Sequence, residues 1–111
     1  MAYDHELAER IRRFIGSDPD LTEMKMFGGL AFLIAGNMAI AASGQGGAMV
    51  RVDPQQSHAL VATTTASLVE MRGRPMPGWL IVSSDDLRTD DQLAPWVNRG
   101  IGYARSLPPK R

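Results

Sequence analysis

The sequence predicts an α+β fold in two layers, in which an antiparallel sheet carries helices on one face. Three observations support this prediction. Apolar residues recur with helical period near both ends of the chain, short strand-like segments separated by glycine-rich turns fill residues 21–52, and strands and helices do not alternate strictly as they do in parallel sheets. The expected order is a helix, three or four strands, a second helix, one or two strands and a last helix. A chain of 111 residues holds one core, so we expect a single domain over residues 1–111.

The first expected helix extends from about Tyr3 to Ile15, because its apolar residues recur at intervals of three and four. Residues 21–52 are predicted to form four antiparallel strands. In the first of these, Met24 and Met26 alternate with charged residues, which is typical of a half-exposed strand. The next, residues 30–34, is apolar on both faces and is expected near the centre of the sheet.

A second helix is expected from Asp53, a favourable N-cap followed by Pro54, to about Thr63. Residues 68–71 are predicted to form a short strand. A further strand is expected from Trp79 to Ser83, after a stiff loop of proline and glycine over residues 72–78.

The last helix is expected over residues 90–106. Thr89 and Gln92 have the spacing of a capping box, yet Pro95 then falls beyond the first turn and removes a backbone hydrogen bond. Two alternatives follow: the helix starts nearer Asp91, or it is kinked at Pro95. Its apolar stripe consists of Leu93, Trp96, Val97, Ile101 and Ala104.

Composition argues against several classes of function. The chain has no cysteine, which excludes disulfides, thiolate metal sites and a cysteine nucleophile. His5 and His58 lack neighbouring ligands at metal-binding spacing, and no serine lies in a nucleophile elbow. We therefore expect no catalytic residues, no metal and no cofactor. The 12 basic and 12 acidic residues balance, which disfavours nucleic-acid binding without excluding a local basic patch.

Two motifs that resemble binding loops have simpler interpretations. Residues 43–47 are rich in glycine but join two strands and lack the lysine of a phosphate loop, so a hairpin turn is expected. The acidic pairs at 85–86 and 90–91 lack the later glutamate of a calcium loop and are expected to cap a helix.

The sequence predicts a cytoplasmic protein without membrane contact. Its first ten residues are polar and acidic, unlike a signal peptide. The longest apolar stretch, residues 30–42, is interrupted by Gly36 and Asn37 and is too short to span a bilayer as a helix.

The seven methionines are an unusually large number for this length. Methionine fills irregular cores and also forms adaptable binding surfaces. We expect Met24, Met26, Met38 and Met49 to face the core or a dimer interface. Core packing is the preferred interpretation for the whole set.

One segment stands out as a candidate binding site. Arg72 and Arg74 lie in the proline- and glycine-containing segment that leads to Trp79, and guanidinium groups match the geometry of carboxylates and phosphates. The candidate binding residues are therefore Arg72, Arg74 and Trp79, together with Arg99 from the last helix. The structural alternative is a rigid connector whose arginines form ion pairs with Glu70 or with the acidic pair at 85–86.

Three segments resemble the TfoX/Sxy N-terminal domain family, whose members regulate natural competence in bacteria. They are residues 26–40, 71–79 and 96–110, and the most specific motif is Lys-Met-Phe-Gly-Gly at 25–29. The resemblance implies a two-layer α+β domain like that of secretion chaperones, often dimeric and without known enzymatic activity. Full-length members carry a second, C-terminal helical domain, and this chain ends at Arg111, so we expect a stand-alone domain.

The expected function is therefore a non-enzymatic regulatory or protein-interaction domain, acting as a homodimer with a possible protein partner. The alternative is a module that binds an anionic ligand or nucleic acid through Arg72 and Arg74.

Overall fold

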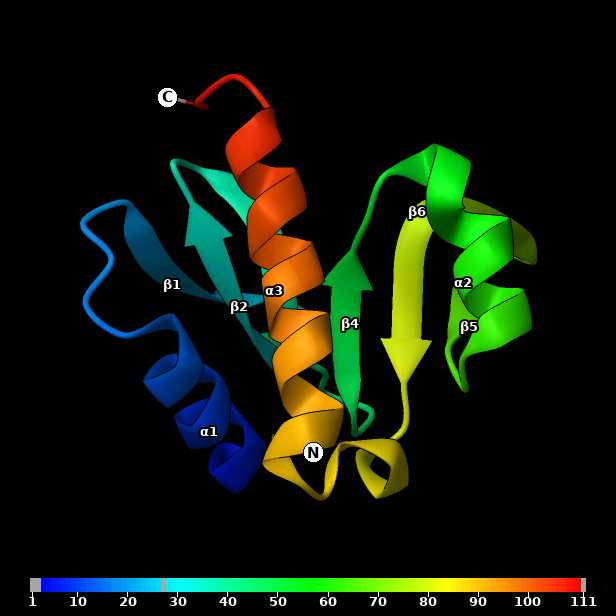
Figure 1. Ribbon diagram of the computed structural model, residues 1–111, viewed down its shortest axis with the longest axis horizontal. Coiled ribbons are helices and arrows are strands. Elements are labelled where there is room, and N and C mark those ends of the chain that lie inside the picture. The colour runs from blue at the N-terminus through cyan, green and yellow to red at the C-terminus, as the bar shows by residue number, and fades with distance from the viewer. Residues whose placement is uncertain (1–2, 27, 111) are drawn as a thin grey trace.

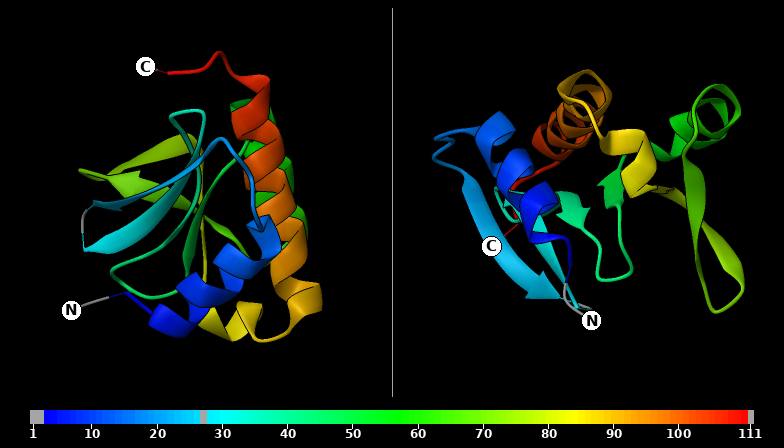
Figure 2. Two further views of the ribbon diagram at one scale, coloured as in Figure 1. Left: turned by 90° about the vertical axis from the view of Figure 1, so that its left-hand side faces the viewer. Right: turned by 90° about the horizontal axis from the view of Figure 1, so that it is seen from below.

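The computed structural model describes residues 3–26 and 28–110 and confirms the predicted α+β class. Six strands form one antiparallel sheet in the order β1-β2-β3-β4-β6-β5, and the helices lie together on one face of it (Figures 1 and 2). The strands are β1 (Leu21–Met26), β2 (Gly29–Ile34), β3 (Asn37–Ala42), β4 (Ala48–Arg51), β5 (Ser67–Met71) and β6 (Arg74–Val82). The helices are α1 (His5–Ile15), α2 (Ser57–Thr63) and α3 (Asp90–Ser106), with the 3-10 turns η1 (Pro54–Gln56) and η2 (Ser84–Leu87).

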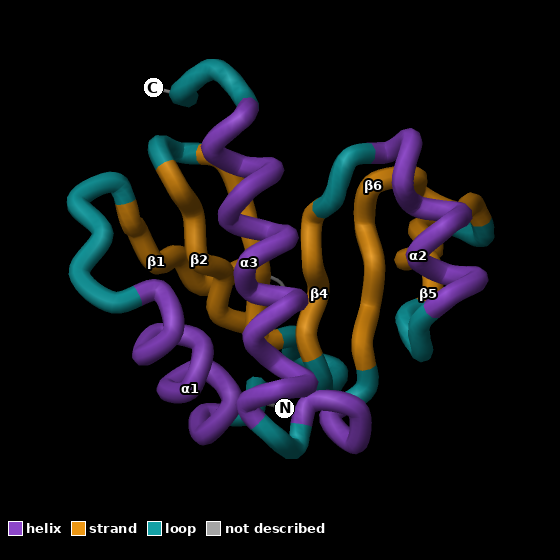
Figure 3. The backbone as a smooth tube through the Cα atoms, viewed as in Figure 1, coloured by secondary structure: helices purple, strands orange, loops and turns teal. Residues whose placement is uncertain are grey.

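The main core lies between the sheet and the helix layer, which is purple in Figure 3. The long helix α3 packs mainly on β3 and β4, whereas α2 packs on β5 and β6. Its largest fully buried side chains are branched aliphatic and aromatic, and they include Phe32, Ile11, Ile34, Ile40, Leu80, Leu87 and Leu93. It contains none of the methionines that the structure describes.

Strand β2 confirms the expectation drawn from its sequence. It lies between β1 and β3, and all six of its residues are buried. Leu30, Phe32 and Ile34 face the helices, while Ala31 and Leu33 belong to a separate cluster on the other face.

The strand β6 begins at Arg74, five residues earlier than the sequence indicated. Residues 72–78 are therefore not a loop: Arg72 and Gly73 form a two-residue hairpin turn with φ of 56° and 77°, and the chain then pairs with β5. The prolines at 75 and 77 are tolerated because β6 pairs with β4 only from Trp79 onward. Before that residue β6 has a single neighbour, so a missing N–H breaks no second ladder.

Two helix boundaries also differ from the prediction. Helix α1 begins at His5 rather than Tyr3, because the side chain of Asp4 accepts a hydrogen bond from the Leu7 amide and so caps the helix there. The second helix is divided into η1 and α2, and Asp53 caps only the first of these pieces.

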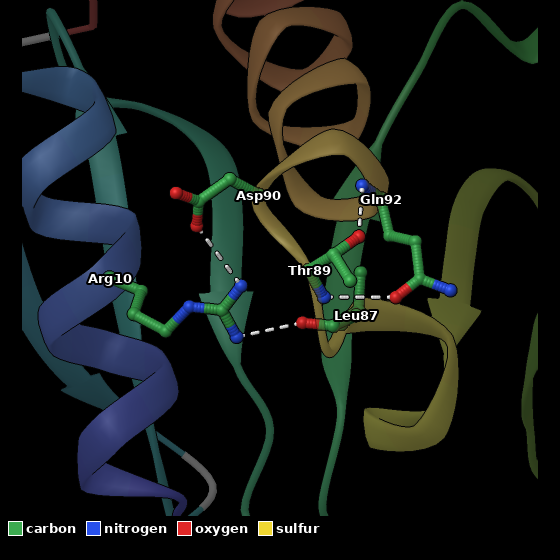
Figure 4. A network of polar contacts seen from close by, with 5 residues as sticks. All are labelled: Arg10, Leu87, Thr89, Asp90 and Gln92. Atoms are coloured by element: carbon green, nitrogen blue, oxygen red, sulfur yellow. Dashed lines mark hydrogen bonds and ion pairs between the residues drawn. The ribbon is translucent and has the colours of Figure 1, made fainter.

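The start of α3 excludes the later start considered because of Pro95, whereas the kink at Pro95 stays a prediction. The helix begins at Asp90, and Thr89 forms a full capping box with Gln92, with both hydrogen bonds present (Figure 4). Pro95 lies inside the helix. The guanidinium of Arg10 donates a 2.7 Å hydrogen bond to the Leu87 carbonyl oxygen beside this cap and so ties α1 to the start of α3 (Figure 4).

An ion pair joins α1 to the edge strand β1. Arg12 donates from Nε and Nη2 to the two carboxylate oxygens of Glu23 at 2.6 and 2.7 Å. This hydrogen bonding, opposed by partial burial, lowers the pKa of Glu23 below its ordinary value of 4.5. A carboxylate with a lowered pKa stabilises the fold above its unfolded-state pKa, and that contribution is lost as the pH falls through the folded-state pKa.

Glu23→Gln should therefore destabilise the protein at pH 7 by up to about 1 kcal/mol, as expected for a partly exposed ion pair. The difference from wild type should shrink as the pH falls below about 4.5, because protonation then breaks the same pair in the wild type. Urea unfolding at pH 7 and pH 3 measures both values. Glu70→Gln, at an exposed strand carboxylate, is the control. A deficit that is equal at the two pH values would contradict the assignment.

None of the helices described by the structure has the length and apolar character needed to cross a membrane.

Candidate functional site

The sheet face opposite the helices is lined with methionine. Met24 pairs with Ala31, and Met26 with Gly29, so these side chains stand on the same side of the sheet as the second cluster. We call this surface the methionine face; it comprises Met24, Met26, Ala31, Leu33, Met38, Ala41, Met49, Val69, Met71, Met76 and Trp79.

The methionines shield smaller residues of the sheet from solvent. Ala31, Leu33 and Ala41 are buried although no described helix lies over them, because Met26, Met38 and Met49 pack against them. The outermost methionines remain open to solvent: Met24 is 47% exposed and Met71 is 52% exposed. Large apolar side chains left exposed together on one surface are typical of an interaction site.

The methionine face is hollowed. Figure 2 shows the sheet bent so that β1–β2 and the β5–β6 hairpin both reach away from the helix layer. Between these two ends lies an apolar hollow of about 260 Å³, whose lining includes Met26, Met38, Met49, Met71, Met76 and Trp79. A second hollow of about 500 Å³ adjoins it and shares Ser43, Met49, Val69 and Met71 with the first.

The described methionines are absent from the main core under the helices, and Met26, Met38 and Met49 pack instead against the smaller cluster on the other face. The pattern of alternate residues in β1 was predicted correctly, but the helices cover the other side of the sheet. The helix-side core of β1 and β2 instead takes Leu21, Leu30, Phe32 and Ile34. The dimer interface named as an alternative for four of the methionines stays a prediction.

Arg72 and Arg74 lie at the exposed tip of the β5–β6 hairpin, next to Met71 and two residues from Met76. The structure describes Glu70 and the acidic pair at 85–86, and no ion pair joins them to either arginine; Asp85 instead pairs with Arg88 at 2.9 Å. The interpretation of the segment as a connector held by ion pairs is therefore wrong. Both guanidinium groups are accessible to an anionic group.

Of the other two candidates, Trp79 lies on the methionine face and Arg99 does not. Arg99 stacks on the ring of Trp96, 4.5 Å from its centroid, and belongs to α3 on the opposite side of the sheet. Trp79 lines the methionine hollow, and its ring is 5.0 Å from the guanidinium carbon of Arg51. The structure thus places Arg74, the register partner of Met71, on the same side of the sheet as Trp79, with Arg72 in the adjoining turn, and leaves Arg99 apart.

The described residues contain no cluster of three or more histidine and carboxylate side chains that could hold a metal ion. His5 lies exposed in α1 and His58 lies exposed in α2. The hydroxyl of Ser57 is fully buried and accepts a 2.6 Å hydrogen bond from the Gly78 amide, so it ties α2 to β6.

The fold is an α+β domain whose sheet has an apolar, methionine-rich surface on the side opposite the helices. Residues 15–104 match the model of the TfoX N-terminal domain, and the chain belongs to that family, as its sequence motifs indicated. This family is regulatory and non-enzymatic. No curated protein matches the chain.

Proposed function

We propose that this chain is a non-enzymatic regulatory domain that acts by binding another protein through its methionine face. The observation that supports the proposal is the separation of side chains between the two sides of the sheet. Branched aliphatic residues pack under the helices, whereas the described methionines gather on the uncovered side. Flexible thioether side chains adapt to a partner's surface at little cost, which is why methionine is common at adaptable binding surfaces.

Site-specific photo-crosslinking in cells tests this proposal. A photoreactive phenylalanine analogue replaces Met38, in the hollow, or Asn98, exposed on α3 as the matched control. The expected result is one identified protein adduct from position 38 that is absent from position 98. Met49→Lys in the same chain should remove the adduct, because it places a charge in the wall of both hollows. Adducts from position 98 alone, or from neither position, would refute the proposal.

A second candidate function, binding of an anionic ligand or nucleic acid by Arg72 and Arg74, is favoured by their exposure without ion pairs to the neighbouring acidic residues. Two arginines on one hairpin form a small cationic site, and Arg99 does not extend it. The balance of 12 basic and 12 acidic residues favours a short anionic group over a nucleic-acid backbone.

We also propose that the chain forms a homodimer through the edge of β1. This strand ends the sheet, has exposed backbone, and carries no proline. Antiparallel pairing of two copies about Met24 places Glu23 of each opposite Lys25 of the other, so the charges match. Light scattering at micromolar concentration should give the mass of two chains for the wild type and one chain for Met24→Lys, which sets like charges opposite each other. A wild-type mass of one chain would refute the dimer.

A further inference from the structure

We propose that the methionine face binds an apolar protein segment that carries acidic residues at one end, and that this acidic end contacts Arg72 and Arg74. The inference rests on the proposed function and specifies the chemistry of the partner. Four observations support it: the character of the lining, the size of the hollows, the charges beside them and the mismatch of the face with a copy of itself.

The lining requires an apolar occupant. The first hollow contains five methionines together with Trp79, and Ser43 is its one hydroxyl side chain. A polar ligand would lose its hydration here without finding hydrogen-bonding partners, which costs several kcal/mol for each buried polar group. Aliphatic and aromatic side chains meet no such cost.

The size of the hollows favours a peptide with more than one anchoring side chain. An apolar cavity of about 150 Å³ holds a benzene ring, so the first hollow, at about 260 Å³, accepts one or two large side chains. The adjoining hollow of about 500 Å³ shares Met49 and Met71 with it and extends along β5. Two connected hollows fit successive apolar residues of one segment, as when an amphipathic helix binds a groove.

The charges beside the hollows determine which end of the bound segment lies at the hairpin. Met71, which both hollows share, is followed at once by Arg72, and the hairpin turn fixes where Arg72 and Arg74 stand. Among the residues that the structure describes, Glu70 is the one carboxylate lining either hollow, so the basic charge prevails at this end. A guanidinium group binds a carboxylate through paired, charge-assisted hydrogen bonds, and these are about twice as strong as neutral ones.

A second copy of the chain does not match this surface. Two methionine faces placed together would each offer the same basic hairpin, and neither would offer an acidic group besides Glu70. Like charges in an interface oppose association. A different protein with acidic residues beside its apolar anchors is therefore the occupant that the charges favour.

Two synthetic amphipathic peptides test the inference by calorimetric titration of the full chain. They share one apolar face of leucine and phenylalanine and differ only at one end, where one carries four glutamates and the other four lysines. We expect the acidic peptide to bind at least about tenfold more tightly at low salt. Arg72→Glu with Arg74→Glu should reverse this preference. Arg13→Glu with Arg88→Glu changes the net charge equally at exposed sites on the helix side and should preserve it.

Two further measurements test binding in the hollow without relying on the arginine substitutions. Trp96→Phe leaves Trp79 as the single tryptophan, and its emission should shift on binding because Trp79 lines the hollow. Met49→Lys should abolish binding of both peptides. The two double arginine variants should melt near the wild type, since surface changes usually alter stability by no more than about 0.5 kcal/mol. Trp96→Phe shortens a buried core side chain and should melt lower, so its emission is read at a temperature where circular dichroism shows it folded.

Several outcomes would overturn the inference. These are no binding of either peptide, equal binding that ignores the Arg72 and Arg74 substitutions, and tight binding of dodecanoate that displaces the acidic peptide. A dimer that Met49→Lys dissociates would equally overturn it, because a second copy would then occupy the face. If crosslinks still form from position 38 while the peptides show no charge preference, the proposed function survives and this inference fails.

Discussion

Trp96→Ala is expected to lower the free energy of unfolding by about 3–5 kcal/mol, the usual result of truncating a large buried aromatic side chain. Trp96 lies at the middle of α3 with only 5% of its surface exposed, and it packs in the core between that helix and the sheet. Its loss leaves a cavity in this close-packed core, which the surrounding buried side chains can fill only in part. A domain of this size has a total stability of about 5–15 kcal/mol, so the variant should melt more than about 10 °C below the wild type.

Trp79→Ala is the matched control for this prediction. The two tryptophans have the same size, but Trp79 stands on the uncovered face and is only half-buried. Its removal should cost about half as much or less. Urea unfolding followed by far-ultraviolet circular dichroism, which does not depend on tryptophan emission, measures both. A smaller loss for Trp96→Ala than for Trp79→Ala would show that α3 does not carry the main core.

The order of elements was predictable because local signals in the sequence agree with the fold. Glycine-containing turns follow β2 at residues 35–36 and β3 at residues 43–47, and the second is the hairpin turn expected there. Neighbouring strands joined by short turns pair antiparallel almost by necessity. The start of β6 was missed because prolines at 75 and 77 are typical of loops, and only the pairing with β5 reveals that this part of the strand has one neighbour.

The methionine face was not predictable in the same way. Alternation along β1 shows that Met24 and Met26 share a side of the sheet, but it does not say which side receives the helices. Strand β2 is apolar on both sides, so its sequence does not decide the question either. The useful signal was the type of side chain: the described methionines lie on one side, and most of the buried Ile and Leu side chains lie on the other. Shape requirements under a packed helix explain that difference.

The candidate arginines show the same limit of local reasoning. Arg72 and Arg74 were found because they are two residues apart on a constrained segment, and they do share the tip of one hairpin. Arg99 was grouped with them by charge alone. Arg99 lies on α3, so the sheet separates it from the methionine face. Which side of the sheet a helix covers depends on the tertiary structure and cannot be inferred from a short segment of sequence.

Gly100→Ala and Gly102→Ala are expected to change stability in opposite directions, although they make the same change in the same helix. Alanine is favoured over glycine inside a helix by about 1 kcal/mol. Gly102 is exposed, and a β-carbon there would have no neighbour within 4 Å, so the substitution should stabilise the protein by up to that amount. Gly100 is buried where α3 crosses β3, and a β-carbon there would overlap the carbonyl oxygen of Ala39.

The overlap at Gly100 involves backbone, which cannot rotate aside as a flexible side chain can. Either α3 moves away from the sheet or β3 deforms, and both disturb the packing of Trp96 and Val97 in the core. Overpacking of this kind typically costs about 1–3 kcal/mol, which exceeds the gain in helix propensity. Gly100→Ala should therefore unfold at lower urea concentration than the wild type and Gly102→Ala at higher. Stabilisation by both substitutions would mean that α3 stands farther from β3 than the close approach at Gly100 requires.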